Sequence, residues 1–337
     1  MKLVPVKTIK QPAFTFAIAH DKSKIAICGL RNVVIYRLPL MTKMQTISVA
    51  NPSSAVFLAD DCTLLILNTS GMTFIWHGGE LERLGRWPVP QWFERPLHYG
   101  DDHHIFWGGH GGIWCFDAKS RTMTHLYKAN AQAEICASSD GVLKFLLMEQ
   151  EPADEQSIVL VEMRFDGTVQ HFCKTKNCLK TRLVGRPVWS NDGFIALSTV
   201  AAPQESRHTE KAISYRFTQD GRAYAETADI EEIEAVSAAT VMYLLDREGN
   251  ILVNKKFDTT ENYGDLFCFR DCIVKCSLLS GTASFMALHD LQTLHVVERS
   301  DFRKDCGANP PTFACYAESG LVLVGSWEKL MLFHLEG

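Results

Sequence analysis

Short apolar runs, separated by turn residues, follow one another along the whole chain. Each is roughly four to eight residues long, rich in β-branched and aromatic side chains, and bounded by Gly, Asp, Asn or Ser. Examples are PAFTFAIA, KIAICGL, NVVIYRL, CTLLILN, HIFWGG, LVLVGSW and KLMLFHL. No stretch of about ten residues shows the periodicity of an amphipathic helix. The pattern predicts an all-β chain.

A short motif, an aromatic residue often followed by Asp, recurs where a group of three strands is expected to end. Its copies centre on Tyr36, Trp76, Phe116, Phe165, Phe217 and Phe257, with weaker copies at His289 and His334. Successive copies are 40, 40, 49, 52, 40, 32 and 45 residues apart. A unit of roughly 40–45 residues with four short strands is typical of a propeller blade. We expect the aromatic residue to face a core between sheets and the Asp to cap the next turn.

This pattern resembles a degenerate WD40-like (YVTN-type) β-propeller repeat, and the resemblance covers essentially the whole chain. The chain has no Trp-Asp dipeptide, and its Gly109-His110 pair lies between two expected strands. The hydrogen-bonded tetrad of WD40 blades is therefore not carried over to residues of this chain. The resemblance implies a propeller of four-stranded antiparallel blades.

Strand triplets are expected at 13–38, 54–77, 96–117, 133–166, 187–218, 233–258, 265–290 and 313–335. They favour eight blades, and seven is the alternative if the 32-residue unit joins a neighbour. The first strand, KLVPVKTI, is expected to pair with the last triplet and close the ring, which would remove an open sheet edge. A ring has no internal linker, so residues 1–337 are predicted to form one domain.

Two polar, proline-containing stretches are longer than tight turns. They are residues 149–157 (EQEPADEQS) and 201–211 (AAPQESRHTEK), each between the second and third strands of its unit. We expect surface insertions that lie side by side on one face of the ring. Loops on a rigid scaffold are where binding functions concentrate.

Charge and cysteine usage limit the class of protein. The net charge of -5 argues against general nucleic-acid binding, although the basic stretch 174–186 leaves RNA or a phosphorylated segment as a minor alternative. The 11 cysteines are odd in number, and several lie within apolar runs, as free thiols do in a reducing compartment. There is no signal-peptide pattern and no membrane-length apolar run. We expect a cytoplasmic protein without a membrane segment.

The densest group of ligand-type residues is His98, Asp101, Asp102, His103, His104 and His110. Adjacent residues of a strand lie on opposite faces, so His103 and His104 do not easily share one metal ion. A solvated turn is the favoured interpretation, and residues 108–112 (GGHGG) are expected to form another turn rather than a phosphate loop. No Gly-x-Ser-x-Gly elbow occurs. No catalytic residue, metal or cofactor is predicted. The alternative function is an enzyme or small-ligand sensor with a metal near His98, Asp102 and His110 in the central funnel.

The favoured function is protein or peptide binding on one face of the ring. Loops between the second and third strands share that face with the loops that join blades. The expected binding residues there are Arg31, Trp92, Phe93, Arg95, His110, Arg182, Arg186 and Trp327. Tryptophan, tyrosine and arginine are the residue types that dominate interface energetics. The sequence therefore predicts a non-catalytic WD40-like scaffold whose partner is a protein or peptide.

Overall fold

A computed structural model shows that every regular element of the described chain is a β-strand. It describes residues 2–87, 97–150, 156–175, 181–189, 195–201, 205–217, 223–235, 240–257, 266–269, 272–277, 282–287, 296–301, 317–318, 321–325 and 328–336. The strands pair antiparallel throughout, which confirms the all-β prediction. Within these residues, no helix is long and apolar enough to cross a membrane.

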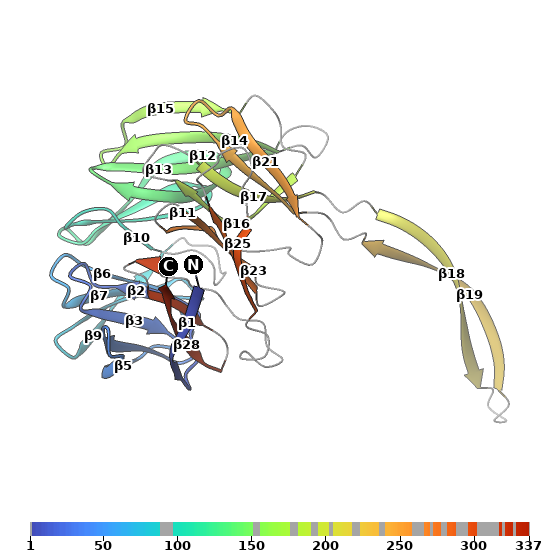
Figure 1. Ribbon diagram of the computed structural model, residues 1–337, viewed down its shortest axis with the longest axis horizontal. Helices are drawn as coiled ribbons and strands as arrows, with labels where there is room; N and C mark the ends of the chain where they lie inside the picture. Colours follow the sequence, from blue (N-terminus) through green and yellow to red (C-terminus); the bar gives the residue numbers. More distant parts are fainter. Residues whose placement is uncertain are drawn as a thin grey trace.

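Two four-stranded sheets come first after the N-terminal strand (Figure 1). The first contains β2 (Thr15–Ile18), β3 (Lys24–Cys28), β4 (Asn32–Arg37) and β5 (Thr42–Ser48), in that order. The second contains β6 (Pro52–Phe57), β7 (Thr63–Asn68), β8 (Met72–His77) and β9 (Glu80–Arg86). The next sheet has six strands, β10 (His98–Tyr99), β11 (His104–Asp117), β12 (Thr122–Ser139), β13 (Val142–Gln150), β14 (Gln156–Arg164) and β15 (Val169–Lys174).

Three further four-stranded sheets follow. One contains β16 (Thr181–Trp189), β17 (Ile195–Ala201), β20 (Thr240–Leu245) and β21 (Ile251–Phe257). The next contains β22 (Leu266–Phe269), β23 (Cys272–Ser277), β24 (Thr282–Ala287) and β25 (Val296–Asp301). The last joins β26 (Ala317–Glu318), β27 (Leu321–Gly325) and β28 (Leu330–Glu336) to β1 (Lys2–Ile9). A separate pair, β18 (Glu205–Phe217) and β19 (Ala223–Ala235), forms a two-stranded hairpin.

The cores lie between neighbouring sheets, and alternate residues of a central strand contribute to two of them. On β3, Ile25 and Ile27 pack with Leu323 and Leu332 of the last sheet, whereas Ala26 packs on the other side, against the second sheet. On β7, Leu64 and Ile66 belong to one core, and Leu65 and Leu67 belong to the next. Both faces of these strands are therefore buried, which explains why they are continuous apolar runs rather than alternating ones.

The fourth strand of a sheet is polar because it lies at the outer edge. β5 and β9 are mostly exposed, in contrast to the buried β3 and β7. Four of the repeated aromatic residues face the cores between sheets, as predicted: Tyr36 and Phe116 are buried, and Trp76 and Phe165 are partly buried against their cores. The weaker copy at His334 is exposed, so the prediction is wrong for that residue. Charged outer strands also discourage pairing with other chains.

Strand β11 folds back on itself. The amide of Ala118 donates to the carbonyl of His103 at 2.7 Å, although a straight strand of this length would span roughly 45 Å. The reversal lies at Gly111 and Gly112, whose φ angles are 99° and 121°. The turn predicted for residues 108–112 is thus confirmed. β12 pairs with β11 through Thr122–Lys128 and again at Gln132, which lies opposite His110. It pairs with β13 through Gln132–Ser139.

The predicted triplets at 187–218 and 233–258 are wrong. β17 pairs directly with β20, so the two segments contribute to one sheet. The stretch 201–211, expected to be a surface loop, instead contains the end of β17 and the start of β18. Phe217, expected as a blade aromatic, ends β18 in the hairpin. Local alternation of residues predicts strands but cannot identify their partners, which caused this error.

The two ends of the chain meet in one sheet. β1 and β28 pair antiparallel from Lys2↔Glu336 to Ile9↔Leu330, and Figure 1 shows the termini close together. The expected pairing of the first strand with the last triplet is confirmed. The predicted loop 149–157 is shortened, because β13 reaches Gln150 and β14 begins at Gln156; residues 151–155 lie outside the described residues.

Gly112 should be much less tolerant of substitution than Gly111. An added Cβ at Gly112 would lie 1.9 Å from the backbone carbonyl oxygen of Tyr127, whereas one at Gly111 would meet nothing within 4 Å. Both positions share the backbone strain of a positive φ, so Gly111→Ala is the matched control. We expect Gly112→Ala to cost roughly 2 kcal/mol more than Gly111→Ala in free energy of unfolding, measured by chemical denaturation. Equal losses would contradict the close approach of β11 and β12.

Candidate functional site

Backbone hydrogen bonds define one face of the molecule, called here the insertion face. It is made of the connections between the middle strands of each sheet and the segments that join neighbouring sheets. The amide of Asn51, which joins β5 to β6, donates to Leu30 at 3.0 Å, and the amide of Thr69 donates to Asn51 at 3.0 Å. The amide of Trp87 then donates to Gly71 at 2.8 Å. These bonds fix the β3–β4 and β7–β8 turns side by side.

Two of the predicted binding residues can be placed here with their side chains. Arg31 is exposed in the β3–β4 turn, beside Leu30, which is 39% exposed. His110 is exposed at the reversal of β11. Below that reversal, His125 Nε2 lies 2.9 Å from the carbonyl oxygen of Gly111, and its ring stacks on Trp114 with centroids 4.0 Å apart. The contacts of His125 with Gly111 and Trp114 therefore stabilise the turn that carries His110.

The other predicted binding residues cannot be compared in the same way. Trp92, Phe93, Arg95 and Trp327 lie outside the described residues. Arg182 and Arg186 were expected in a linking loop, but they belong to strand β16, in which Arg182 is paired with Val200. Residues 181–189 form a strand because they pair with β17 as the first strand of the sheet β16-β17-β20-β21. The structure thus brings Arg31 and His110 to equivalent turns and leaves the grouping of the remaining residues a prediction.

The histidine and aspartate group does not form one site. His104 starts the first arm of β11 and His110 ends it, so they are roughly 20 Å apart along an extended strand. Asp102 and His103 belong to the β10–β11 turn, at the opposite end of the sheet from His110. A metal site that joins His98, Asp102 and His110 is therefore contradicted. Among the described residues, no three His, Cys, Asp or Glu side chains converge as metal ligands do.

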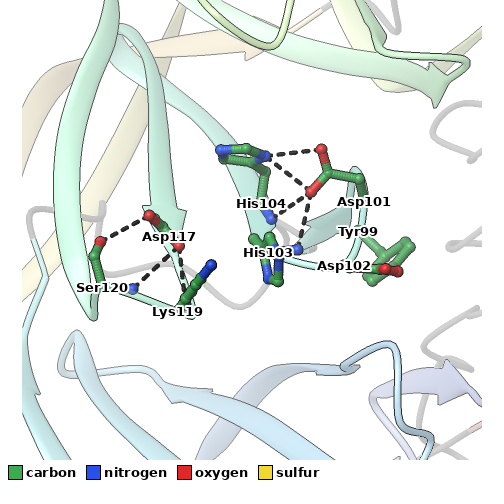
Figure 2. Close-up of polar contacts among 8 residues, drawn as sticks. All are labelled: Tyr99, Asp101, Asp102, His103, His104, Asp117, Lys119 and Ser120. Atoms are coloured by element: carbon green, nitrogen blue, oxygen red, sulfur yellow. Dashed lines mark hydrogen bonds and ion pairs between the residues drawn. The ribbon is translucent and has the colours of Figure 1, made fainter.

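Asp101 organises the turn between β10 and β11 (Figure 2). Its Oδ1 accepts hydrogen bonds from the amides of His103 and His104, both at 2.9 Å, and His104 Nδ1 lies 2.8 Å from each carboxylate oxygen. Partial burial opposes ionisation of Asp101, but these hydrogen bonds outweigh it and lower the pKa of the carboxyl group. The predicted turn is confirmed, and Asp101 is its structural centre.

The predicted capping role of Asp after the aromatic residue is also observed. Asp117 accepts from the amide of Lys119 at 2.8 Å and from the Ser120 hydroxyl at 2.7 Å. Asp166 accepts from the amide of Thr168 at 2.8 Å. The Ser120 hydrogen bond is the main cause of the lowered pKa of Asp117, and the Thr168 amide is the main cause for Asp166. These carboxylates stabilise turns through their own backbone rather than through a ligand.

Sequence reasoning missed a second set of contacts, which ties three sheets together on the face opposite the insertion face. The Asp61 carboxylate accepts from the amides of His20 at 2.6 Å and Asp21 at 2.9 Å, so it joins the β6–β7 turn to the β2–β3 turn. The His20 ring packs on Tyr99, with centroids 3.9 Å apart. The Tyr99 hydroxyl donates a hydrogen bond to the Asp102 carboxylate at 3.1 Å. Burial is the main cause that raises the pKa of this hydroxyl to about 12, and the contact with Asp102 is the next. Adjacent carboxylates at positions 60 and 61 were the available signal.

The cysteines are buried in part only: Cys62 is exposed, and Cys136 and Cys173 are half-buried. Cys28 and Cys115 are buried and free, and burial raises the pKa of each thiol to about 12. A thiol with so high a pKa is not a nucleophile near neutral pH. The described part of the chain therefore assigns these two residues to the cores between sheets.

Replacing Asp101 should destabilise the protein in a pH-dependent way. Because its pKa is lowered on folding, its ionised form adds stability above its ordinary pKa of 3.8, and that stability is lost as the pH falls through the folded value. We expect Asp101→Ala to cost about 1 kcal/mol of unfolding free energy at pH 7, and less below pH of about 3.5. Glu80→Ala, an exposed carboxylate on β9, is the control. A pH-independent loss would contradict the role of the charge.

Comparison with known proteins identifies the fold. No protein-family model and no curated protein sequence matches this chain. The structure is similar to the N-terminal domain of Nup159, with a TM-score of 0.64 and 12% identity, covering 98% of this chain and 95% of that one. It is also similar to the C-terminal WD40 domain of Sif2, with a TM-score of 0.59 and 10% identity, covering 96% of this chain and 82% of that one. Identities this low show the fold alone, which is that of a WD40-like β-propeller.

Proposed function

We propose that residues 1–337 form one domain, a ring of seven blades closed by β1. Five four-stranded sheets each supply one blade. The six-stranded sheet supplies two, because β11 folds back and β12 pairs with β11 through its first half and with β13 through its second. The merging of two expected units into one sheet favours seven blades over eight. The core that Leu323 and Leu332 share with Ile25 and Ile27 supports contact between the last blade and the first.

Removal of residues 2–9 tests the closure. Without β1, strand β28 becomes an unprotected edge, so its amides should exchange with solvent faster and the unfolding midpoint should fall by several degrees. Removal of Gly337 alone is the control, because this residue lies beyond the end of β28. Unchanged protection of β28 in the variant lacking residues 2–9 would overturn the proposed closure.

We propose that the protein is a non-catalytic scaffold that binds a protein or peptide through its insertion face. The observation that carries this proposal is the hairpin β18–β19, inserted between the two middle strands of a blade. The corresponding connections of the first two sheets are short turns. A propeller that is rigid elsewhere and extended at one face offers a surface for a partner. Exposed Leu30, Arg31 and His110 add to that surface.

The proposed location is the cytoplasm. The buried free thiols of Cys28 and Cys115 support a reducing compartment, since neither is paired in a disulfide. Fractionation of the source cells, with detection of the native protein, tests this location. Recovery outside the cytoplasmic fraction would contradict it.

Substitution of the predicted aromatic and basic residues tests the binding face. Affinity capture should recover a partner with the native chain and lose most of it with Trp92→Ala, Arg95→Ala and Trp327→Ala combined, because anchors of these types carry about 2 kcal/mol or more each. Lys119→Ala, in the β11–β12 turn of the opposite face, is the matched control. Both variants should keep the native unfolding midpoint. Equal capture by native and combined variant would reject this face.

A further inference from the structure

The hairpin β18–β19 is a long ribbon with two open edges. Its register runs without a shift from Glu205↔Ala235 to Phe217↔Ala223. Figure 1 shows it extending away from the other sheets, and no third strand pairs with it in the part of the chain that the structure describes. An isolated two-stranded hairpin is only marginally stable in water, and a third strand adds the missing hydrogen bonds. Pairing with a third strand would therefore increase the stability of the ribbon.

The outer edge of β19 lacks the features that usually prevent strand addition. It has no proline, no lysine and no bulge, whereas the outer edge of β18 carries Lys211 and two arginines. The sequence AYAETADIEEIEA contains five acidic residues and no basic one. The edge of β19 therefore permits pairing with another strand, and its acidic residues favour a strand that carries basic residues.

Charge is unevenly distributed between the two faces of the ribbon. The hairpin strands contain seven acidic and three basic residues, a net charge of −4, where the whole chain carries -5. The register places Glu210, Glu226, Glu232 and Glu234 on one face, with Arg216 as the one basic residue among the described positions of that face. We call this the acidic face. The other face contains Ile213, Tyr215, Phe217, Ala223, Ala225, Ile233 and Ala235. It also carries three acidic and two basic residues, of which only Lys211 and Asp229 lie opposite each other.

We propose that the outer edge of β19 accepts a third strand from a partner protein, in which Lys or Arg alternates with apolar residues. This inference rests on the proposed function as a protein-binding scaffold. In an added strand, every second residue lies on the acidic face, and the residues between lie on the other face, which carries most of the large apolar residues. Basic residues beside Glu226, Glu232 and Glu234 make favourable cross-strand pairs, and apolar residues extend the other face.

The β19 strand of a second copy fits the β19 edge poorly. Pairing β19 with another β19 would place acidic residues beside acidic residues, and like charges opposite one another are destabilising. The acidic edge therefore disfavours pairing with another β19 while it favours a basic strand.

A synthetic peptide of about ten residues, alternating Lys and Val, tests the proposal with the full chain. We expect binding by fluorescence anisotropy and slower amide exchange within residues 223–235 on addition of the peptide. The variant Glu226→Lys, Glu232→Lys, Glu234→Lys should bind it about tenfold more weakly or worse, since each reversal turns an attractive pair into a repulsive one. Lysine substitutions at Glu80 and Glu82, on the exposed outer strand β9, are the matched control and should leave binding unchanged.

Backbone methylation of the same peptide separates strand addition from charge attraction. Methyl groups on alternate amide nitrogens remove hydrogen-bond donors and keep every charge, so binding should fall by about tenfold or more. A variant in which a Gly-Ser linker replaces residues 202–239 should not bind the peptide. Equal binding of the methylated peptide, equal binding by the linker variant, or dimerisation through the hairpin would each overturn the proposal.

The two proposals can fail separately. If partner capture is lost on substitution of Trp92, Arg95 and Trp327 but the peptide does not bind, the scaffold function stands and the strand-addition proposal is rejected. If capture survives those substitutions while the peptide binds the hairpin, the strand-addition proposal stands and the proposed binding face is rejected.

Discussion

Burial of both faces of each central strand is the constraint on which the rest of the structure depends. β3 and β7 lie within their sheets, and successive residues of each pack into cores on opposite sides. A sheet of this kind needs a neighbour on each side, since an apolar face left in water would cost roughly 25 cal/mol per Å². The first and last sheets also share a core, which contains Ile25, Ile27, Leu323 and Leu332. The sheets therefore stack because their central strands carry apolar residues on both faces.

The polar groups serve the same architecture at the ends of the strands. Asp101, Asp117 and Asp166 each accept hydrogen bonds from the backbone of the turn they begin, and Asp61 joins turns of two sheets. Carboxylates that are engaged in this way do not present an open ligand site. The histidines that look like a cluster in the sequence are divided between the two ends of β11. Binding function is therefore better sought in the shape and edges of one face than in a polar pocket.

The hairpin β18–β19 departs from this arrangement. Strands in the other sheets pair within groups of at least four, whereas these two pair only with each other among the described residues. In the proposed strand addition, a basic strand from a partner protein pairs with its acidic outer strand. The same physical demand, that backbone groups and apolar faces be satisfied, underlies the pairing of β1 with β28 and the strand addition proposed for the hairpin.

The sequence by itself determined most of the strands, the turns and the burial of Cys28 and Cys115, because these depend on residues close together in the chain. Apolar runs predicted β3 and β7, glycines predicted the turn in β11, and the aromatic repeat predicted Tyr36 and Phe116 in their cores. Only the tertiary structure decided the pairing of β17 with β20, the release of β18 and β19 as a hairpin, and the separation of His104 from His110. A strand has the same two-residue alternation whether it completes a blade or a free ribbon, so its partner is chosen by long-range packing.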